Sequence, residues 1–406
     1  MNIYNLFCNY FLLITITAFL HVLTGIGWLT TLLLPIIIFI CVFKIKYKIK
    51  IQINLMDILW ILSFLWMVST WLYNDFPNKG IMIVRCISSQ IAYMMVYWIA
   101  RKSNRNVIGN IITSSYLPLI LTCIIGIYCF LFHPSWYESM VYKTLEDHEV
   151  RLSEMELMEA FRLRSIFDSP YTLAYFTSIT LIFLFFSMLD NHKNAKDYYL
   201  FIFLLFVTLL LTMMRAPIVC TLIGFFVSLV YSFKYRGGKL LAKYIVVGFF
   251  VSFLLIIVFI NIDSSSLDFL FSKFNTVTSN TDELLEKRLF LQEADGLLFG
   301  DGVGRHAIYA PKYGGYGMLD GEYMKMIQEQ GYIGLFFFLL FVIFALLKCI
   351  FYIKELSFEF CLLIMLLICM IGANPLSTGD KHPIIFWLAF GQIARFKSPI
   401  CFKHNL

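Results

Sequence analysis

Apolar residues along this chain occur in long runs, and short polar segments separate one run from the next. A helix that crosses the hydrocarbon core of a bilayer needs about 20 residues, so 406 residues have room for about a dozen such helices with loops between them. The runs predict spans near residues 5–22, 26–43, 55–73, 81–99, 107–132, 167–189, 198–213, 216–233, 244–261, 332–349, 355–372 and 383–395.

The composition agrees with this pattern. Hydrophobic residues make up 60% of the chain and charged residues 14%, whereas a soluble domain has roughly 45–50% apolar and about 25% charged residues. The mean hydropathy is +0.78. These values exclude a soluble globular enzyme and a disordered protein, and the basic residues are too few and too scattered to form a nucleic-acid groove. The sequence predicts an all-α, polytopic integral membrane protein, with one membrane domain over residues 1–406 and about 12 transmembrane helices.

The cysteines and the N-terminus add two smaller expectations. All ten cysteines lie in or beside the apolar runs, which predicts small membrane-buried side chains and no disulfide framework. The first ten residues have neither a basic segment nor a clear cleavage site, which predicts a first span that is retained.

Lysine and arginine gather in alternate connections between the predicted spans. These basic connections include Lys44, Arg101, Lys193, Lys234, Lys348 and Arg395. Because short cytoplasmic loops are rich in Lys and Arg, this bias predicts that both ends of the chain are cytoplasmic. The two long connections, near residues 133–166 and 262–331, are then extracytoplasmic, and they contain most of the acidic residues. Long loops in compact proteins tend to be functional.

Several arginines lie on this predicted outer side. Arg215 lies in the short turn between two apolar runs, two residues before Pro217. It either reaches to lipid headgroups or binds an anion together with the free N–H groups of a helix that begins there. Arg162, Arg164 and Arg288 either pair with neighbouring acidic residues or together bind a diphosphate, for which the planar guanidinium fork is suited.

A glycine-rich stretch and two carboxylates complete the outer segments. Residues 300–304 read Gly-Asp-Gly-Val-Gly, and no evident strand precedes them, so we expect a tight turn that brings the backbone close to another element. Asp320 and Glu322 are either acids at a helix start or a carboxylate base for a sugar hydroxyl. His306 and His382 lie on the same side, but no metal-ligand spacing occurs in the sequence, so no metal site is predicted.

The order and spacing of these segments resemble the O-antigen polymerase and ligase superfamily of bacterial polysaccharide assembly. The resemblance covers roughly residues 160–345 in its motifs and the whole chain in its hydropathy pattern. The matching residues are Arg164, Phe167 and Pro170 at the start of a span, Thr212 and Arg215 in the arginine turn, Arg288 in the large outer loop, Gly300, Gly302 and Gly304, and then Glu329, Gly331 and Gly334. The ligase branch has a His-Asn-x-Tyr-Leu pattern before the last motif. Residues 320–324 here read Asp-Gly-Glu-Tyr-Met, without a histidine, which favours a polymerase.

The resemblance implies a metal-independent glycosyltransferase of the bacterial inner membrane that uses no cofactor. An O-antigen polymerase transfers a growing glycan from undecaprenyl diphosphate to the non-reducing end of a lipid-linked repeat unit on the periplasmic face. The residues implied are Arg164, Arg215 and Arg288 on the diphosphates, Arg162 and Arg305 as secondary candidates, and Asp320 or Glu322 on the acceptor hydroxyl.

The resemblance also implies partners. These are the lipid bilayer, lipid-diphosphate-linked oligosaccharides, a chain-length regulator and a flippase, and no nucleic acid. The alternatives are an O-antigen ligase, a polysaccharide flippase or other transporter, and a non-catalytic assembly partner. A transporter would place ionisable residues inside its spans, whereas the notable arginines here lie at span ends and in outer loops, apart from Arg85.

Overall fold

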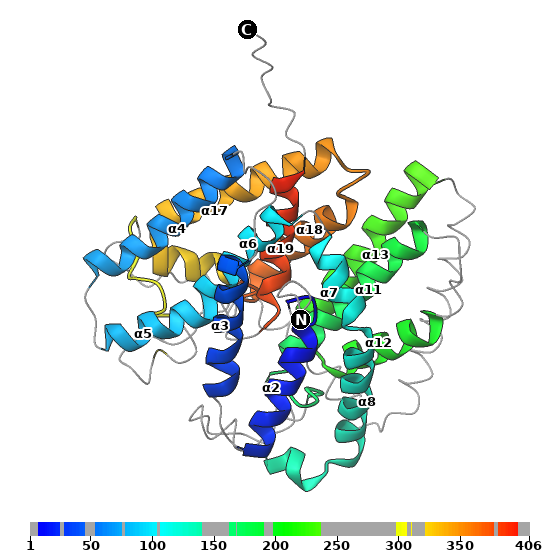
Figure 1. Ribbon diagram of the computed structural model, residues 1–406. Helices are drawn as coiled ribbons and strands as arrows, with labels where there is room; N and C mark the ends of the chain where they lie inside the picture. The colour runs from blue at the N-terminus through cyan, green and yellow to red at the C-terminus, as the bar shows by residue number, and fades with distance from the viewer. Residues whose placement is uncertain are drawn as a thin grey trace, which may run out of the picture.

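The computed structural model describes residues 7–24, 28–44, 53–74, 78–103, 106–139, 162–167, 169–190, 198–236, 298–306, 310, 321–376 and 381–396. Every regular element within these residues is a helix (Figure 1), which confirms the predicted all-α class. The predicted span 244–261 lies outside the described residues, as do most of the two long loops.

A helix lies at each of the other predicted spans. The helices are α2 (Tyr10–Thr24), α3 (Trp28–Lys44), α4 (Leu55–Tyr73), α5 (Lys79–Cys86), the π-helix η1 (Ile87–Ile91), α6 (Ala92–Lys102), α7 (Val107–Ser114), α8 (Tyr116–Phe132), α11 (Pro170–Asp190), α12 (Tyr199–Leu211), α13 (Arg215–Arg236), α17 (Glu322–Phe351), α18 (Ser357–Gly372) and α19 (Pro383–Arg395). The segments α5, η1 and α6 follow one another without a gap and occupy one predicted span.

Several of these helices are long and apolar enough to cross a membrane. Four meet both criteria, namely Leu55–Leu72, Lys79–Lys102, Pro170–Met188 and Glu322–Phe351, and a fifth span results if α7 and α8, bent by 48°, count as one. The remaining apolar helices are shorter, such as Tyr199–Leu211 and Pro383–Arg395. The helices therefore have membrane-spanning character, while the twelve-span arrangement stays a prediction.

One predicted boundary is wrong. The sequence places the second outer loop at 262–331 and the next span at 332–349, but α17 already begins at Glu322. Gly331, with φ 71° and ψ 178°, interrupts this helix and separates a short first part from the long apolar part. Only glycine adopts such a backbone conformation readily. The hydropathy pattern detects the apolar second part alone, because the first part contains charged residues.

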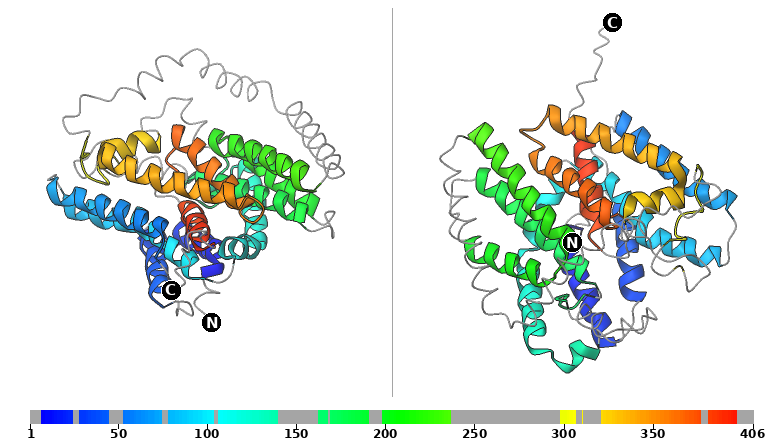
Figure 2. Two further views of the ribbon diagram at one scale, coloured as in Figure 1. Left: turned by 90° about the horizontal axis from the view of Figure 1, so that it is seen from above. Right: turned by 180° about the vertical axis from the view of Figure 1, so that it is seen from behind.

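The helix α19 lies at the centre of the bundle. On one side of it α4 and α17 run side by side, and on the other side α11 and α13 do the same (Figures 1 and 2). All its residues from Pro383 to Ala394 are buried, as expected for a helix that is apolar all round. Gly391 lets α19 approach α6 closely, since a Cβ there would collide with the Tyr97 carbonyl. The nine described cysteines are buried, as predicted.

Candidate functional site

The glycine-rich turn lies against the break in α17. The Asp301 N–H donates to the Gln328 carbonyl at 2.6 Å. Gly300 has a φ of 77° and touches the backbone of Gly331, so that a Cβ on either glycine would collide with the other segment. A helix that stops leaves its last carbonyls without helical partners, and the turn supplies donors for them. The predicted close approach of this turn to another element is confirmed.

The end of α4 holds both segments in place. The indole N–H of Trp66 donates to the carbonyl of Gln330 at 2.8 Å, directly at the break. One and a half turns further along α4, the indole N–H of Trp71 donates to the carbonyl of Val303 in the turn at 2.9 Å. These two bonds fix the position of the turn and of the break relative to α4.

Glu329 joins the glycine-rich turn to α17 through its side chain as well. Its Oε1 accepts hydrogen bonds from the N–H groups of Gly304 and His306, both at 3.0 Å. Its own carbonyl accepts from the Gly302 N–H at 3.0 Å. The side chain is 2% exposed. The two motifs of the resemblance, Gly-rich and Glu-x-Gly-x-x-Gly, therefore form one structural unit, and Glu329 holds it together.

The two arginine-bearing segments are in contact. The Leu163 N–H donates to the Leu211 carbonyl at the end of α12, at 3.2 Å. The Arg162 Nη1 donates to the Met214 Sδ at 3.7 Å. The segment before α11 thus packs on the turn between α12 and α13, although the two are far apart in the sequence.

Arg164 lies inside the protein, at 5% exposure. Its neighbour Ser165 has a φ of 58° and donates to the Thr122 carbonyl at 2.7 Å, which anchors the segment on α8. The positive charge of Arg164 lowers the pKa of Tyr137, although burial has the larger effect and raises it overall. Arg164 is therefore an interior guanidinium and not an arginine on an exposed helix.

Arg215 is the first residue of α13, and its side chain is exposed. The turn before it is tight, as predicted. The buried Thr212 donates to the Leu209 carbonyl at 2.6 Å, and Met213 has a φ of 54°. Pro217 lies in the first turn of α13, where its missing N–H leaves no bond unmade. This exposed position suits either of the two predicted roles, headgroup contact or anion binding.

Further contacts place the arginine turn at the same end of the bundle as the start of α17. Near the start of α13, the Cys220 thiol lies 2.9 Å from that of Cys369, near the end of α18. Directly after α18, the Ala373 carbonyl accepts from the Glu322 N–H at 3.0 Å. This end of the bundle, the site end, brings together the arginine turn, the Arg164 segment and Glu322.

The first part of α17 carries three buried charged side chains. Glu322 and Lys325 are each 1% exposed, and Glu329 is 2% exposed. Their spacing of three and four residues puts them on one face of the helix. The Glu322 Oε2 accepts from the Leu376 N–H at 3.0 Å. Glu322 is therefore an interior carboxylate and not a solvated acid at a helix start.

Of the remaining predicted site residues, the structure describes Arg305. Arg305 is half-buried next to the glycine-rich turn, where its backbone N–H donates to the Gly302 carbonyl at 3.3 Å. Arg288 and Asp320 lie outside the described residues. Within the part of the chain that the structure describes, no group of three or more His, Cys, Asp and Glu residues is arranged to hold a metal ion.

His382 directly precedes α19 in the sequence and is buried. Its ring stacks on that of Tyr175, with centroids 4.0 Å apart. Burial lowers the pKa of His382 to about 3, so the imidazole is neutral at physiological pH and packs as an aromatic ring in this place.

The sequence did not reveal a cavity of about 50 Å³ below the charged face of α17. Its walls include Trp60 and Ser63 on α4, Gln90 on η1, and Glu322 and Glu329 on α17. Ser63 and Gln90 are polar residues inside predicted spans, which is a signal that could have marked them. Nothing in the local sequence distinguishes Trp60 from the other aromatic residues of the span.

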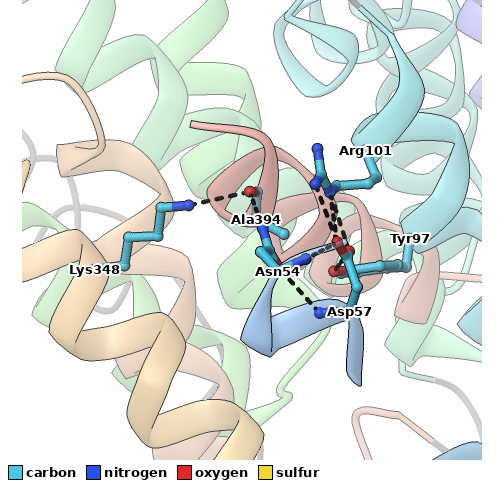
Figure 3. A network of polar contacts seen from close by, with 6 residues as sticks. All are labelled: Asn54, Asp57, Tyr97, Arg101, Lys348 and Ala394. Atoms are coloured by element: carbon cyan, nitrogen blue, oxygen red, sulfur yellow. Dashed lines mark hydrogen bonds and ion pairs between the residues drawn. The ribbon is translucent and has the colours of Figure 1, made fainter. Parts of the chain in front are cut away.

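A second polar cluster occupies the opposite end of the bundle (Figure 3). Arg101 binds Asp57 through two nitrogens, with Nε at 3.0 Å from Oδ1 and Nη2 at 3.0 Å from Oδ2, and the Tyr97 hydroxyl donates to the same carboxylate at 2.5 Å. The Ala394 carbonyl accepts from Lys348 at 3.0 Å and from Asn54 at 2.8 Å. These contacts connect α4, α6, α17 and α19. Both oxygens of the Asp57 carboxylate accept hydrogen bonds, which indicates a structural role.

Comparison of the chain with known proteins does not identify a family. No protein-family model matches the chain, and neither a curated protein nor a solved structure is significantly similar to it.

Proposed function

We propose that this protein is a membrane-embedded glycosyltransferase that acts on lipid-diphosphate-linked oligosaccharides, an O-antigen polymerase. The observation that carries the proposal is the contact between the Arg164 segment and the Arg215 turn at the bundle end that also contains Glu322. Two arginines from separate elements, one buried and one exposed, suit an anion that lies at the rim of the bundle with its lipid chain in the bilayer.

The proposed reaction is the transfer of the donor glycan to the acceptor. A hydroxyl oxygen of the acceptor repeat unit attacks the anomeric carbon of the donor glycan. The bond from that carbon to the diphosphate oxygen breaks, and undecaprenyl diphosphate leaves with the electron pair. Arg164, Arg215 and Arg288 stabilise the charge that develops on the leaving diphosphate. Asp320 or Glu322 takes the proton of the attacking hydroxyl.

The location belongs to the same proposal. Both long loops face the periplasm in the predicted topology, so the site end faces the outer leaflet of the bacterial inner membrane. An O-antigen ligase shares this location and chemistry with a different acceptor, and the absence of a histidine in residues 320–324 favours the polymerase.

A flippase or another transporter is the second candidate, and one observation favours it. Glu322, Lys325 and Glu329 are buried charges on a helix that breaks at Gly331, and discontinuous helices with interior charges are typical of transporters. Purified protein in detergent separates the two functions, because no membrane sides exist there. A polymerase lengthens lipid-linked repeat units in detergent, and a transporter does not.

The arginine assignment is tested by the same assay. Arg164→Ala, Arg215→Ala and Arg288→Ala are each expected to slow polymer formation by about 10²–10³-fold, the effect of removing one preorganised donor to a developing charge. Arg215→Lys should restore only part of the rate, because an ammonium group cannot form the bidentate fork. The matched control is Arg85→Ala, which removes an exposed arginine on α5. Wild-type rates in two of the three alanine variants would refute a shared diphosphate site.

The carboxylates require their own comparison. Asp320→Asn and Glu322→Gln keep the side-chain size and remove the basic group, so the variant that loses the base should slow by about 10²–10⁴-fold. Wild-type rates in both variants would assign the proton to the donor diphosphate or to solvent.

A further inference from the structure

Three hydrogen-bond donors line the cavity between α4, η1 and α17. They are the indole Nε1 of Trp60, the hydroxyl of Ser63 and the amide Nε2 of Gln90, and no partner for any of them occurs among the described residues. The three side chains are 3%, 9% and 7% exposed. A buried polar group without a partner costs about 1–3 kcal/mol, so three such groups around one cavity indicate a ligand that supplies acceptor atoms.

The donors are fixed in place by their surroundings. Gln90 belongs to the π-helix η1, a form of helix that often occurs at functional sites. The Cys86 thiol donates to the Gln90 Oε1 at 3.4 Å, which sets the orientation of the amide. Trp60 is stacked on Phe64 at 5.3 Å and on Tyr97 at 5.6 Å, so its indole cannot turn to find another partner.

The opposite wall of the cavity provides acceptors. Glu322 and Glu329 both line it, and backbone N–H groups from the surrounding loops hold each carboxylate. Two carboxylates disfavour an anionic ligand, and the indole and amide N–H groups disfavour a cation. A group that both donates and accepts, a hydroxyl, matches donors on one wall and carboxylates on the other.

The volume limits the size of the ligand. A bound water takes at least about 10–15 Å³, so a cavity of about 50 Å³ has room for a few water oxygens. A whole sugar ring is too large, whereas one hydroxyl or hydroxymethyl arm of a sugar fits.

We propose that this cavity is a hydroxyl-binding site, in which Trp60, Ser63 and Gln90 donate to a small cluster of hydroxyl groups that donate in turn to Glu322 and Glu329. The hydroxyl groups come either from water alone or from water together with one arm of the acceptor sugar. The second source rests on the proposed function, and the site itself does not.

Three methionines in the cavity wall make the proposal testable. Met67, Met94 and Met326 line the cavity and are 5%, 5% and 7% exposed. Synchrotron radiolysis of the purified full chain produces hydroxyl radicals from bound water as well as from bulk water, and methionine is readily oxidised. Mass spectrometry should show several-fold faster oxidation of these three than of Met365 and Met370, which lie on α18, are 1% and 0% exposed, and do not line the cavity. Equal rates in the two groups would show a dry cavity and overturn the proposal.

Donor variants test the three residues themselves. Trp60→Phe keeps the aromatic stacking, Ser63→Ala keeps the helix, and Gln90→Leu keeps the volume, while each removes one donor. The expected result is slower oxidation of Met67, Met94 and Met326 with unchanged oxidation of the two α18 methionines, which also reports that the fold is intact. Unchanged oxidation in all three variants would mean that these donors do not hold the cluster, and would overturn the proposal.

The two sources are separated by adding lipid-linked repeat units. Protection of Met326 from oxidation assigns one hydroxyl to the sugar, and no protection assigns the site to water alone. Radiolysis does not depend on polymer formation. A wild-type protein that oxidises at these methionines but never lengthens a glycan would refute the proposed function and leave the hydroxyl site standing.

Discussion

Asp57 shows how one carboxylate can be tolerated inside a bundle. Its side chain is fully buried, and the idealised cost of burying a charge is far larger than a single bond returns. Asp57 meets that cost with the guanidinium fork of Arg101, the hydroxyl of Tyr97 and the backbone N–H of Asn54. The last of these belongs to a capping box that also starts α4.

We expect Asp57→Ala to lower the free energy of unfolding by about 3–5 kcal/mol, because it leaves the Arg101 charge partly buried without its partner. Thermal and denaturant unfolding of the detergent-purified protein measure this change. Glu355→Ala is the control, since Glu355 is an exposed carboxylate and its loss should change the stability by no more than about 0.5 kcal/mol. Equal stability of the two variants would contradict a structural role of the network.

The sequence predicted Arg101 as a basic residue of a connection, but it could not predict its partner. Arg101 and Asp57 are 44 residues apart, and only the packing of α4 against α6 brings them together. The same holds for Ser63 and Gln90, whose polarity is visible in the apolar runs while their common cavity is not. The conformation of a single segment can be predicted from the sequence where neighbouring residues determine it, as in the turn at Thr212 and Arg215.

At the scale of elements, the start of α17 is the feature that the hydropathy pattern misplaced, because the pattern detects only the apolar part after the break at Gly331. The glycine-rich stretch at residues 300–304 predicted a tight turn and a close approach to another element, and the contact with α17 confirms the approach. The two motifs form one structural unit only through the contact of Gly300 with Gly331. Hydrophobic periodicity in the sequence does not predict a contact between a loop and a helix interior.

Gly331→Ala tests this unit. A non-glycine residue at φ 71° is strained by about 1–3 kcal/mol, and its Cβ would also collide with the Leu298 carbonyl. We therefore expect a loss of stability of at least this size, measured by thermal unfolding, together with faster proteolysis of residues 298–306. The matched control is Gly80→Ala in α5, where a Cβ meets nothing within 4 Å and should stabilise the helix by about 0.5–1 kcal/mol. A Gly331→Ala protein as stable as the control would show that the break does not need glycine.

At the scale of the whole molecule, the two ends of the bundle differ in chemistry. Arg101, Lys348 and Arg395 belong to connections that were predicted to be cytoplasmic, and the structure gathers them at one end, where the Arg395 guanidinium also donates to the Ser103 carbonyl. The arginine turn, the glycine-rich turn and Glu322 were predicted to be extracytoplasmic, and they share the opposite end. The structure thus keeps the two sets of segments at separate ends, as expected if each span reverses the direction of the chain. The side of the membrane on which each end lies stays a prediction.

The direction in which the bundle lies in the membrane is the last prediction. The Lys and Arg bias places residues 133–166 and 262–331 outside the cytoplasm, and a diphosphate site at the outer leaflet requires this orientation. Fusions of alkaline phosphatase at Glu146 and Asn280 should be active, because this enzyme folds only outside the cytoplasm, and fusions of a cytoplasmic fluorescent protein at the same positions should be dark. A fusion at Lys239, in a basic connection, should give the reverse pattern. Phosphatase activity at Lys239 with none at Glu146 would invert the bundle and place the arginines at the cytoplasmic face, which would contradict the proposed periplasmic site.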